Sequence, residues 1–371
     1  MSDAQTLDVA AVSAYLRGHL PGFDGAVTAT KFAGGQSNPT FRLETPAGDY
    51  VLRRKPPGQL LKSAHAVDRE FRVQKALAGT AVPVARMHLL CEDTGIIGSE
   101  FYVMDHVPGR NFNEPTLDGL RPAERAAVMD DMNRVLAALH DVDIEAVGLS
   151  DYGPPGHYLA RQVGRWTKQY RASETQSLAD MDRLMDRLAQ EMPADDGQRT
   201  LVHGDYRIDN MIFEADGTRC RAVLDWELST IGHPYAALAS VIMQWQLPPG
   251  PEGRGLAGLD RAALGLPSDG AFLKAYCARR GIERIDNFGY YVAFCFFRMG
   301  AIIQGVLKRA LDGNASNPER AMQLGAYVPL FAASGLKALG CACPWIPRAW
   351  GASRHGPRNP CSRAALPVYR Y

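Results

Sequence analysis

The segment HGDYRIDNMIFEADGTRCRAVLDWE, residues 203–227, decides the fold of this chain. Two short apolar runs, 211–213 and 222–224, flank a turn at Asp216-Gly217. Apolar runs on either side of an Asp-Gly pair are typical of a β-hairpin. We therefore expect a hairpin here, entered through a polar loop and set between helical regions.

Three polar residues of this segment have the spacing of a phosphoryl-transfer site. Asp205 and, five residues later, Asn210 stand before the hairpin, and Asp225 follows its second strand. Phosphoryl transfer needs a carboxylate at the attacking hydroxyl, and an amide and a second carboxylate that hold magnesium. The order matches HRDxxxxN followed by DFG in protein kinases. Each residue alone is typical of a turn or a helix cap, but the three together favour phosphoryl transfer.

The region before this segment predicts a small sheet with helices. Residues 1–20 have helical spacing, and residues 26–52 contain three short strands joined by tight turns. A helix is expected at 63–78, with Ser63 as its cap. Two further strands then end near Pro108-Gly109, where the pattern changes.

Several groups in this first region suit a nucleotide. The glycine-rich loop 34–38 can bring backbone N–H groups to phosphates, although it lacks the spacing of GxGxxG or of a P-loop and also fits a hairpin loop without a ligand. Arg53 shares a strand face with Val51 and can lie under the phosphates, with Glu70 of the next helix orienting it; a solvated strand arginine is the alternative. Residues 104–107 end the fifth strand and can offer backbone groups to adenine.

The region after Pro108-Gly109 is mainly helical. His140 is expected to be a hydrogen-bonded structural histidine, and the aromatic residues of 290–297 are expected to pack in the core in preference to lining an acceptor pocket. The predicted helices are 122–142, 157–170, 175–191, 234–246, 270–280, 286–311 and 318–339.

Composition limits the classes of function. The 371 residues include 41 Lys and Arg against 40 Asp and Glu, a formal charge of +1, which gives no reason to expect nucleic acid as a partner. The acidic, polar N-terminus does not resemble a signal peptide, and the apolar run 290–297 is too short to cross a membrane. Seven cysteines without a CxxC pair indicate reduced thiols in the cytoplasm.

The last 31 residues, 341–371, differ from the rest. They contain five Arg, five Pro and no acidic residue. A segment of this composition is expected to be a disordered appendage, with a basic tail that binds an acidic partner as the alternative.

On these motifs the chain resembles the aminoglycoside phosphotransferase (APH) family, in the branch similar to the kinase-like N-terminal region of acyl-CoA dehydrogenase family proteins. The resemblance covers roughly residues 25–335. The matching words are GGQSN, YVLRRKPPGQLL, SAHAVDREFRV, FYVMDHVPGR, ALHDVD, RQVGRWTKQY, HGDYRIDNMIF and VLDWELSTIGHP. It implies an α+β, bilobal protein-kinase-like fold: an N-terminal helix at 1–24, a nucleotide-binding N-lobe at 25–108, a helical C-lobe at 109–340 and the tail at 341–371.

The same resemblance implies the role of each site residue. Asp205 is the catalytic base, and Asn210 and Asp225 are ligands of Mg²⁺. ATP is the expected phosphate donor, with GTP left open, and a small molecule is the acceptor. Relatives usually carry Lys where this chain has Arg53, which is more rigid and always charged. The expected nucleotide-binding residues are Gly35, Ser37, Asn38, Arg53, Glu70, Met104, Asp105 and Val107.

Three functions remain open at this point. A small-molecule kinase comes first, a catalytically weak or inactive nucleotide-binding scaffold second. A protein kinase fits poorly, because helices resume directly after residue 227 and leave little room for a peptide-binding loop. Residues 231–340 contain eleven Lys and Arg against seven Asp and Glu, a difference of +4, which favours an anionic or CoA-linked hydroxy compound over a polycationic aminoglycoside.

One departure from the family pattern favours the scaffold. Relatives read GDPxxDLA after the second aspartate, but here His233 and Ala237 replace both carboxylates. In one reading the helix that begins at Pro234 loses its cap, which costs roughly 0.5–2 kcal/mol, and the loop at Asp205 is held less firmly. In the other, which we prefer, water or a neighbouring side chain takes over.

Overall fold

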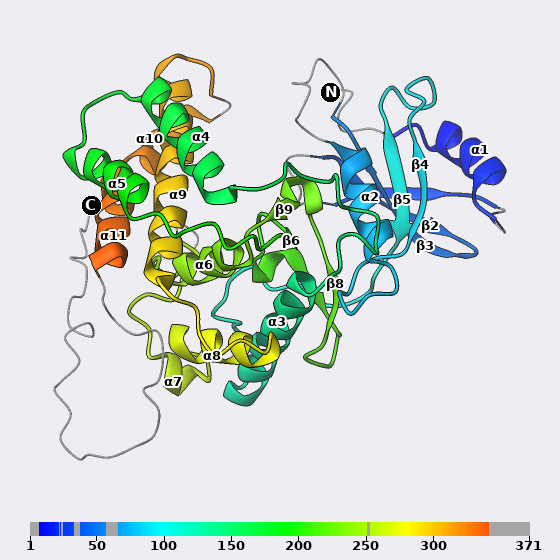
Figure 1. The fold of residues 1–371 in the computed structure, drawn as a ribbon. Coiled ribbons are helices and arrows are strands. Elements are labelled where there is room, and N and C mark those ends of the chain that lie inside the picture. Colours follow the sequence, from blue (N-terminus) through cyan, green and yellow to red (C-terminus); the bar gives the residue numbers. More distant parts are fainter. Residues whose placement is uncertain are drawn as a thin grey trace.

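A five-stranded antiparallel sheet forms the N-terminal lobe, with strand order β1-β2-β3-β5-β4 (Figure 1). The computed structural model describes residues 7–21, 23, 25–32, 38–56, 66–250, 253–315 and 317–340. The strands are β1 (Thr28–Lys31), β2 (Thr40–Thr45), β3 (Gly48–Arg54), β4 (Met87–Cys91) and β5 (Phe101–Asp105). The predicted meander and the two later strands are thereby confirmed, while Ser63 and residues 34–37 lie outside the described residues.

Side chains alternate between the two faces of the sheet along every strand. Both faces carry apolar residues, and a helix covers each of them. Helix α1 (Val9–His19) packs on the face that carries Leu52. Helix α2 (Val67–Leu77) packs on the face that carries Val51 and Tyr102. Arg53 therefore lies on the α2 side, which is the side that faces the second lobe.

The connection between the lobes is bonded to the predicted hairpin that begins at residue 211. After β5 the chain passes Gly109, and Arg110 then exchanges two backbone hydrogen bonds of 2.9 Å with Phe213. A Cβ at Gly109 would lie 2.2 Å from the Phe213 carbonyl oxygen, so only glycine allows this approach.

The second lobe packs helices around two short two-stranded sheets (Figure 1). Helix α9 is its centre and contacts α4, α5, α6, α10 and α11. The helices are α3 (Pro122–His140), α4 (Tyr158–Ser173), α5 (Ala179–Gln190), α6 (Pro234–Trp245), α7 (Arg261–Leu264), α8 (Asp269–Arg279), α9 (Phe288–Leu311), α10 (Pro318–Gly325) and α11 (Val328–Gly340). One sheet pairs β6 (Thr200–Val202) with β9 (Thr230–Gly232), and the other is the hairpin of β7 (Met211–Phe213) with β8 (Cys220–Val223).

Two findings concern the predicted helices. The single helix expected at 318–339 is wrong: α10 ends at Gly325, and α11 begins at Val328. Pro329 explains the break, because a proline inside one continuous helix has no N–H to donate and clashes with the carbonyl four residues earlier. His140 is buried and bonds through Nδ1 to the Tyr276 hydroxyl at 2.7 Å, as expected of a structural histidine.

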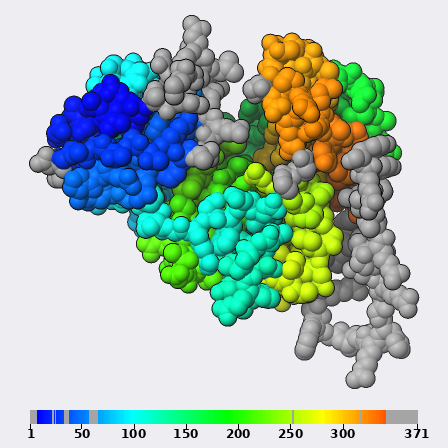
Figure 2. Space-filling model, turned by 180° about the vertical axis from the view of Figure 1, so that it is seen from behind, coloured from blue at the N-terminus to red at the C-terminus, as the bar shows by residue number. Residues whose placement is uncertain are grey.

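Among the described helices, α9 alone has the length and apolar composition that could cross a membrane. However, 72% of its apolar stretch is buried inside the protein, and the aromatic residues of 290–297 pack in the core. Such burial is typical of the core helix of a globular protein. Figure 2 shows the sheet lobe in blue separated from the orange α10–α11 region by an indentation, with green residues of the middle of the chain at its base.

Candidate functional site

The catalytic loop, residues 203–210, brings Asp205 and Asn210 together. The Asn210 amide donates to the Asp205 carbonyl at 2.9 Å and to its carboxylate at 3.2 Å. Gly204 makes the turn possible: its φ is +88°, and a Cβ there would lie 2.3 Å from the Leu228 carbonyl oxygen. The Asp205 side chain keeps 40% of its surface exposed, so its carboxylate is open to a substrate.

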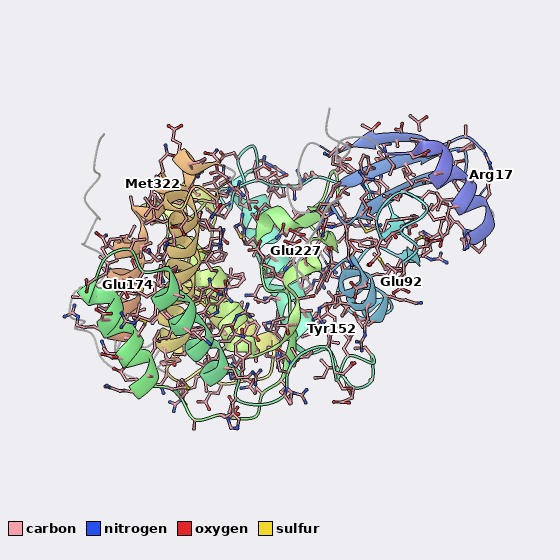
Figure 3. The ribbon with its side chains drawn as sticks, turned by 90° about the horizontal axis from the view of Figure 1, so that it is seen from above. Arg17, Glu92, Tyr152, Glu174, Glu227 and Met322 are labelled. Atoms are coloured by element: carbon pink, nitrogen blue, oxygen red, sulfur yellow. The ribbon has the colours of Figure 1, made fainter. Side chains whose placement is uncertain are left out.

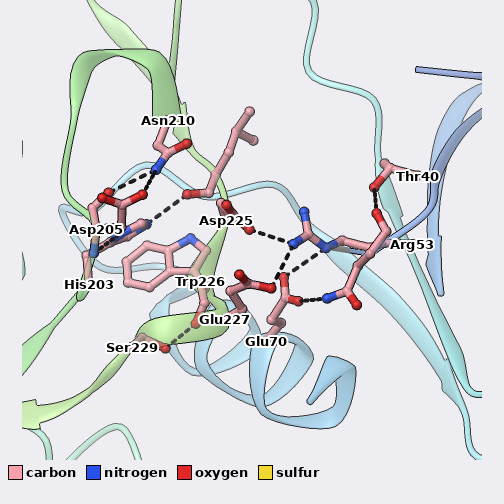
Figure 4. Close-up of polar contacts among 12 residues, drawn as sticks. Thr40, Arg53, Glu70, His203, Asp205, Asn210, Asp225, Trp226, Glu227 and Ser229 are labelled. Carbon is pink, nitrogen blue, oxygen red and sulfur yellow. Dashed lines mark hydrogen bonds and ion pairs between the residues drawn. The ribbon is translucent and has the colours of Figure 1, made fainter. Parts of the chain in front are cut away.

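His203 joins this loop to the strand that leads to Asp225. Its Nδ1 accepts from the Asp205 N–H at 3.3 Å, so Nε2 carries the proton and donates to the Leu224 carbonyl at 2.8 Å (Figure 4). Burial lowers the pKa of His203, which keeps the imidazole neutral. Sequence reasoning quoted this histidine but gave it no role, although its place two residues before Asp205 was a usable signal.

The far end of the loop is also held by neighbours. The Tyr206 hydroxyl donates to the Met132 carbonyl at 2.8 Å. The Asn111 amide donates to the carbonyls of Asp209 and Met211 at 2.7 and 2.9 Å. The Asp209 carboxylate pairs with Arg254 at 2.9 Å. Neighbouring side chains therefore anchor the loop, as the preferred of the two readings expects.

Arg53 joins the two lobes at the centre of the site (Figure 4). Its Nη2 lies 2.5 Å from Asp225 Oδ1 and 3.8 Å from Glu227 Oε2, and its Nε lies 3.2 Å from Glu70 Oε2. Only 12% of the arginine side chain is exposed. Burial disfavours its charge, but the surrounding carboxylates outweigh burial and raise the pKa of Arg53 above its usual value. Glu227 is a member of this cluster that the sequence did not predict.

Glu70 is fully buried beneath Arg53. The Asn38 amide donates to its Oε1 at 2.9 Å, and the Tyr102 hydroxyl donates to its Oε2 at 3.2 Å. Burial raises the pKa of Glu70 to about 7, although the positive charge of Arg53 acts in the opposite direction. Asn38, expected at the nucleotide, is itself buried and holds Glu70.

Asp225 has a backbone conformation that marks a functional position. Its φ of 64° and ψ of 60° lie in the left-handed region, which is uncommon for a residue other than glycine. This turn starts the short helix η3 (Trp226–Leu228) and directs the carboxylate toward Arg53.

The oxygens of Asn210 and Asp225 fit a magnesium ion that completes its coordination with groups from outside the protein. Among the described residues, no group of three His, Cys, Asp or Glu side chains could hold a metal alone. The Asn210 amide nitrogen is engaged, which leaves its oxygen available, and Asp225 supplies carboxylate oxygen. Mg²⁺ commonly takes one or two protein oxygens and completes its shell with phosphates and water. The pair therefore fits a metal that arrives with a nucleotide.

A family comparison agrees with this geometry. The model of the phosphotransferase enzyme family, APH, matches residues 28–276. The chain belongs to the APH family. A provisionally named aminoglycoside phosphotransferase from Ralstonia eutropha, known from a crystal structure, is 46% identical in sequence to this chain. The two structures superpose with a TM-score of 0.83, and the match covers 90% of this chain and 99% of the other. The predicted bilobal kinase-like fold is thereby confirmed.

Curated relatives of this APH-family chain are longer proteins. Acyl-CoA dehydrogenase family member 10 of Mus musculus is 46% identical over 83% of this chain, and family member 11 of Rattus norvegicus is 43% identical over 89%. The chain spans 29% and 43% of their lengths. The aminoglycoside phosphotransferase APH(4)-Ia with AMP-PNP and hygromycin B shares the fold at a TM-score of 0.58 and 16% identity, over 90% of this chain and 99% of its own.

The nucleotide-side residues of this APH-family member are placed as follows. Met104 is buried under α2, and the Asp105 carboxylate contacts His88 Nε2 at 2.5 Å. Among the described residues, no backbone hydrogen bond uses the Val107 N–H. Gly35 and Ser37 lie outside the described residues.

The reading in which α6 loses its cap is wrong. His233 Nδ1 accepts from the Tyr235 N–H at 3.3 Å and thus takes the place of the family aspartate. Its Nε2 lies 3.2 Å from Asp196 Oδ1, which fixes the ring. Burial lowers the pKa of His233 and keeps Nδ1 an acceptor. Ala237 is half-buried.

Proposed function

We propose that this chain is an ATP- and Mg²⁺-dependent kinase that transfers the γ-phosphate to a hydroxyl of a small molecule. The observation that carries the proposal is the contact between Arg53 and Asp225. These residues are 172 positions apart in sequence and come from different lobes, yet they meet beside the loop that carries Asp205. The family supports a small-molecule phosphotransferase, and the polar residues around this contact have the types that the reaction needs.

Each residue then has a defined task. Asp205 accepts the proton of the attacking hydroxyl, and its hydrogen bond from Asn210 orients the carboxylate. Asn210 and Asp225 hold Mg²⁺, which neutralises the charge that develops on the phosphates. Arg53, directed by Glu70, turns from Asp225 to the phosphates when nucleotide binds. Backbone groups near Val107 receive the adenine.

The acceptor that fits best is an anionic or CoA-linked hydroxy compound. The +4 balance of residues 231–340 attracts anions and repels polycationic aminoglycosides. Half-buried Arg298 on α9 donates to Ser240 of α6 at 3.2 Å and, among the described residues, has no carboxylate partner. The names of the relatives also refer to acyl-CoA, a polyanionic thioester.

The experiment is a screen of purified protein with Mg²⁺ and [γ-³²P]ATP against hydroxyacyl-CoAs, free hydroxy acids, sugars, choline and aminoglycosides. Phosphorylation of an anionic acceptor is the expected result. Strong turnover with aminoglycosides alone would remove the proposed acceptor class but leave the kinase proposal standing.

A catalytically inactive scaffold is the second candidate, and one observation favours it. Arg53 occupies an oxygen of the carboxylate that must bind magnesium. In a scaffold this pair stays closed. Replacing Asp225 by Ala separates the two candidates: in a kinase, Mg²⁺-dependent ATP affinity falls because a metal ligand is lost, whereas a permanently closed pair predicts ATP affinity that does not depend on Mg²⁺ in either protein. Isothermal titration with and without Mg²⁺ measures this difference.

A further inference from the structure

A buried contact joins helix α2, which carries Glu70, to two segments of the helical lobe. One segment is the loop around Tyr152, and the other is the turn at Ser229 that follows Asp225. Tyr152 is 1% exposed and Ser229 is 3% exposed. Figure 3 places Tyr152 and Glu227 at the junction of the sheet lobe and the helical lobe.

Arg69, the residue before Glu70, makes the first half of this contact. Its Nη2 donates to the Tyr152 carbonyl at 2.8 Å and reaches the Ser229 carbonyl at 3.4 Å. Its guanidinium lies 4.0 Å above the Tyr152 ring. Stacking and hydrogen bonding together fix a planar cation firmly.

The Tyr152 hydroxyl makes the second half. Its oxygen lies 3.1 Å from the Arg69 carbonyl and 2.8 Å from Ser229 Oγ. Ser229 Oγ in turn donates to the Trp226 carbonyl at 2.6 Å, so the single phenolic proton is shared between Ser229 Oγ and the Arg69 carbonyl. A chain of hydrogen bonds thus runs from the backbone of α2 to the residue next to Asp225.

We infer that Tyr152 is a positioning residue of the nucleotide site, which sets the spacing between Glu70 and Asp225. Arg53 can bridge those two carboxylates only at a fixed spacing. The Tyr152 hydroxyl contacts the α2 backbone on one side of this gap and the Ser229 side chain on the other. Glu70 and Asp225 are therefore held at this spacing before nucleotide binds. This inference rests on the proposed function, because it assigns Glu70 and Asp225 to the phosphates and the metal.

The test is the affinity for AMP-PNP with and without Mg²⁺, measured by isothermal titration. Tyr152→Phe removes the hydroxyl and keeps the ring under Arg69. We expect affinity for Mg²⁺ with AMP-PNP to fall about 3- to 10-fold, which corresponds to one lost hydrogen bond. Affinity for AMP-PNP without Mg²⁺ should change less than about 2-fold, because that part of the binding does not use Asp225.

Two further variants keep the test specific. Ser229→Ala cuts the same chain of bonds and should reproduce the loss, and the double variant should be no weaker than the weaker single variant. Tyr290→Phe is the matched control: its hydroxyl donates to the Leu188 carbonyl at 2.7 Å, deep in the helical lobe. It should lower the melting temperature without changing nucleotide affinity.

The outcomes are distinct. Parent-like Mg²⁺-dependent affinity in both Tyr152→Phe and Ser229→Ala overturns the inference and leaves the proposed function intact. An equal loss with and without Mg²⁺ also overturns it, since Tyr152 would then be only structural. A parent protein that binds no Mg²⁺ with AMP-PNP overturns the proposed function and this inference with it.

Discussion

The two halves of the site are held by different forces. The cluster around Arg53 is held by charge: one buried guanidinium faces Glu70, Asp225 and Glu227. The catalytic loop around Asp205 is held mainly by neutral hydrogen bonds to the backbone, such as those of His203 and Tyr206. Charge pairs can exchange partners when phosphates arrive, whereas backbone bonds have no reason to change. In the proposed kinase, the difference corresponds to a fixed base at Asp205 beside a switchable phosphate-binding group at Arg53.

The strongest test of the fixed half is Asp205→Asn. The amide keeps the shape of the side chain but accepts no proton, so kcat should fall on the order of 10²–10⁴-fold. Affinity for ATP with Mg²⁺ should stay near that of the parent, because the residue lies on the acceptor side. Initial rates with the acceptor found by screening, together with ATP titration, measure both quantities. Equal turnover in variant and parent would remove Asp205 from its assigned role.

Arg53→Met tests the cluster that is held by charge, because it removes the cation that Glu70, Asp225 and Glu227 share. This change leaves the buried Glu70 carboxylate without its cation, and removal of one member of a buried pair costs about 3–5 kcal/mol. Urea unfolding at pH 8 measures the loss. Lys55→Met is the matched control on the same segment: its pair with Glu100 is 2.5 Å long but 23% and 27% exposed, so the loss should stay below about 1 kcal/mol. Equal losses would contradict the special burial of Arg53.

The sequence predicted those parts of the site that lie close together along the chain. Spacing within 203–227 identified Asp205, Asn210 and Asp225, because the motif is local. The pairing of Arg53 with Glu70 was also expected, since strand β3 and helix α2 are neighbours in the chain. These placements in the structure agree with the motif, while their chemical roles stay predictions.

The contacts that sequence reasoning missed are long-range or depend on geometry. Tyr152 lies 83 positions from Arg69, in a loop without periodicity. The role of His233 was misjudged because a histidine caps a helix only in one tautomer, which Asp196 fixes from 37 positions away. Hydrophobic spacing describes faces of helices and strands, and it is silent about such loop contacts.

A smaller effect concerns the pH dependence of stability. The pKa of Glu70 is about 7 in the folded protein, above the usual 4.5. The folded state therefore holds a proton that the unfolded state releases, and this stabilisation is full below pH 4.5 and is lost as pH rises through 7. A shift of this size corresponds to a change on the order of 3 kcal/mol. Glu70→Gln should remove this slope in urea unfolding measured from pH 4.5 to 8; an unchanged slope would contradict the assignment.

The smallest predicted effect tests the helix cap beside the fixed half. His233→Ala removes the acceptor for the Tyr235 N–H and should lower stability by about 0.5–2 kcal/mol. His233→Asn restores an acceptor of similar reach and should recover most of the loss. Thermal unfolding of the three proteins measures this, and a loss that Asn fails to reduce would show that packing of the ring, not capping, is what matters.

The two backbone bonds between Arg110 and Phe213 tie the connection between the lobes to the β7–β8 hairpin. Any rotation of the sheet lobe about this point acts on the hairpin through a short lever arm and on the distant edge of the sheet through a long one. A rotation of this kind would displace α1 and the outer strands much more than Asp205. In the proposed kinase, nucleotide could then enter and leave while Asp205 keeps its position.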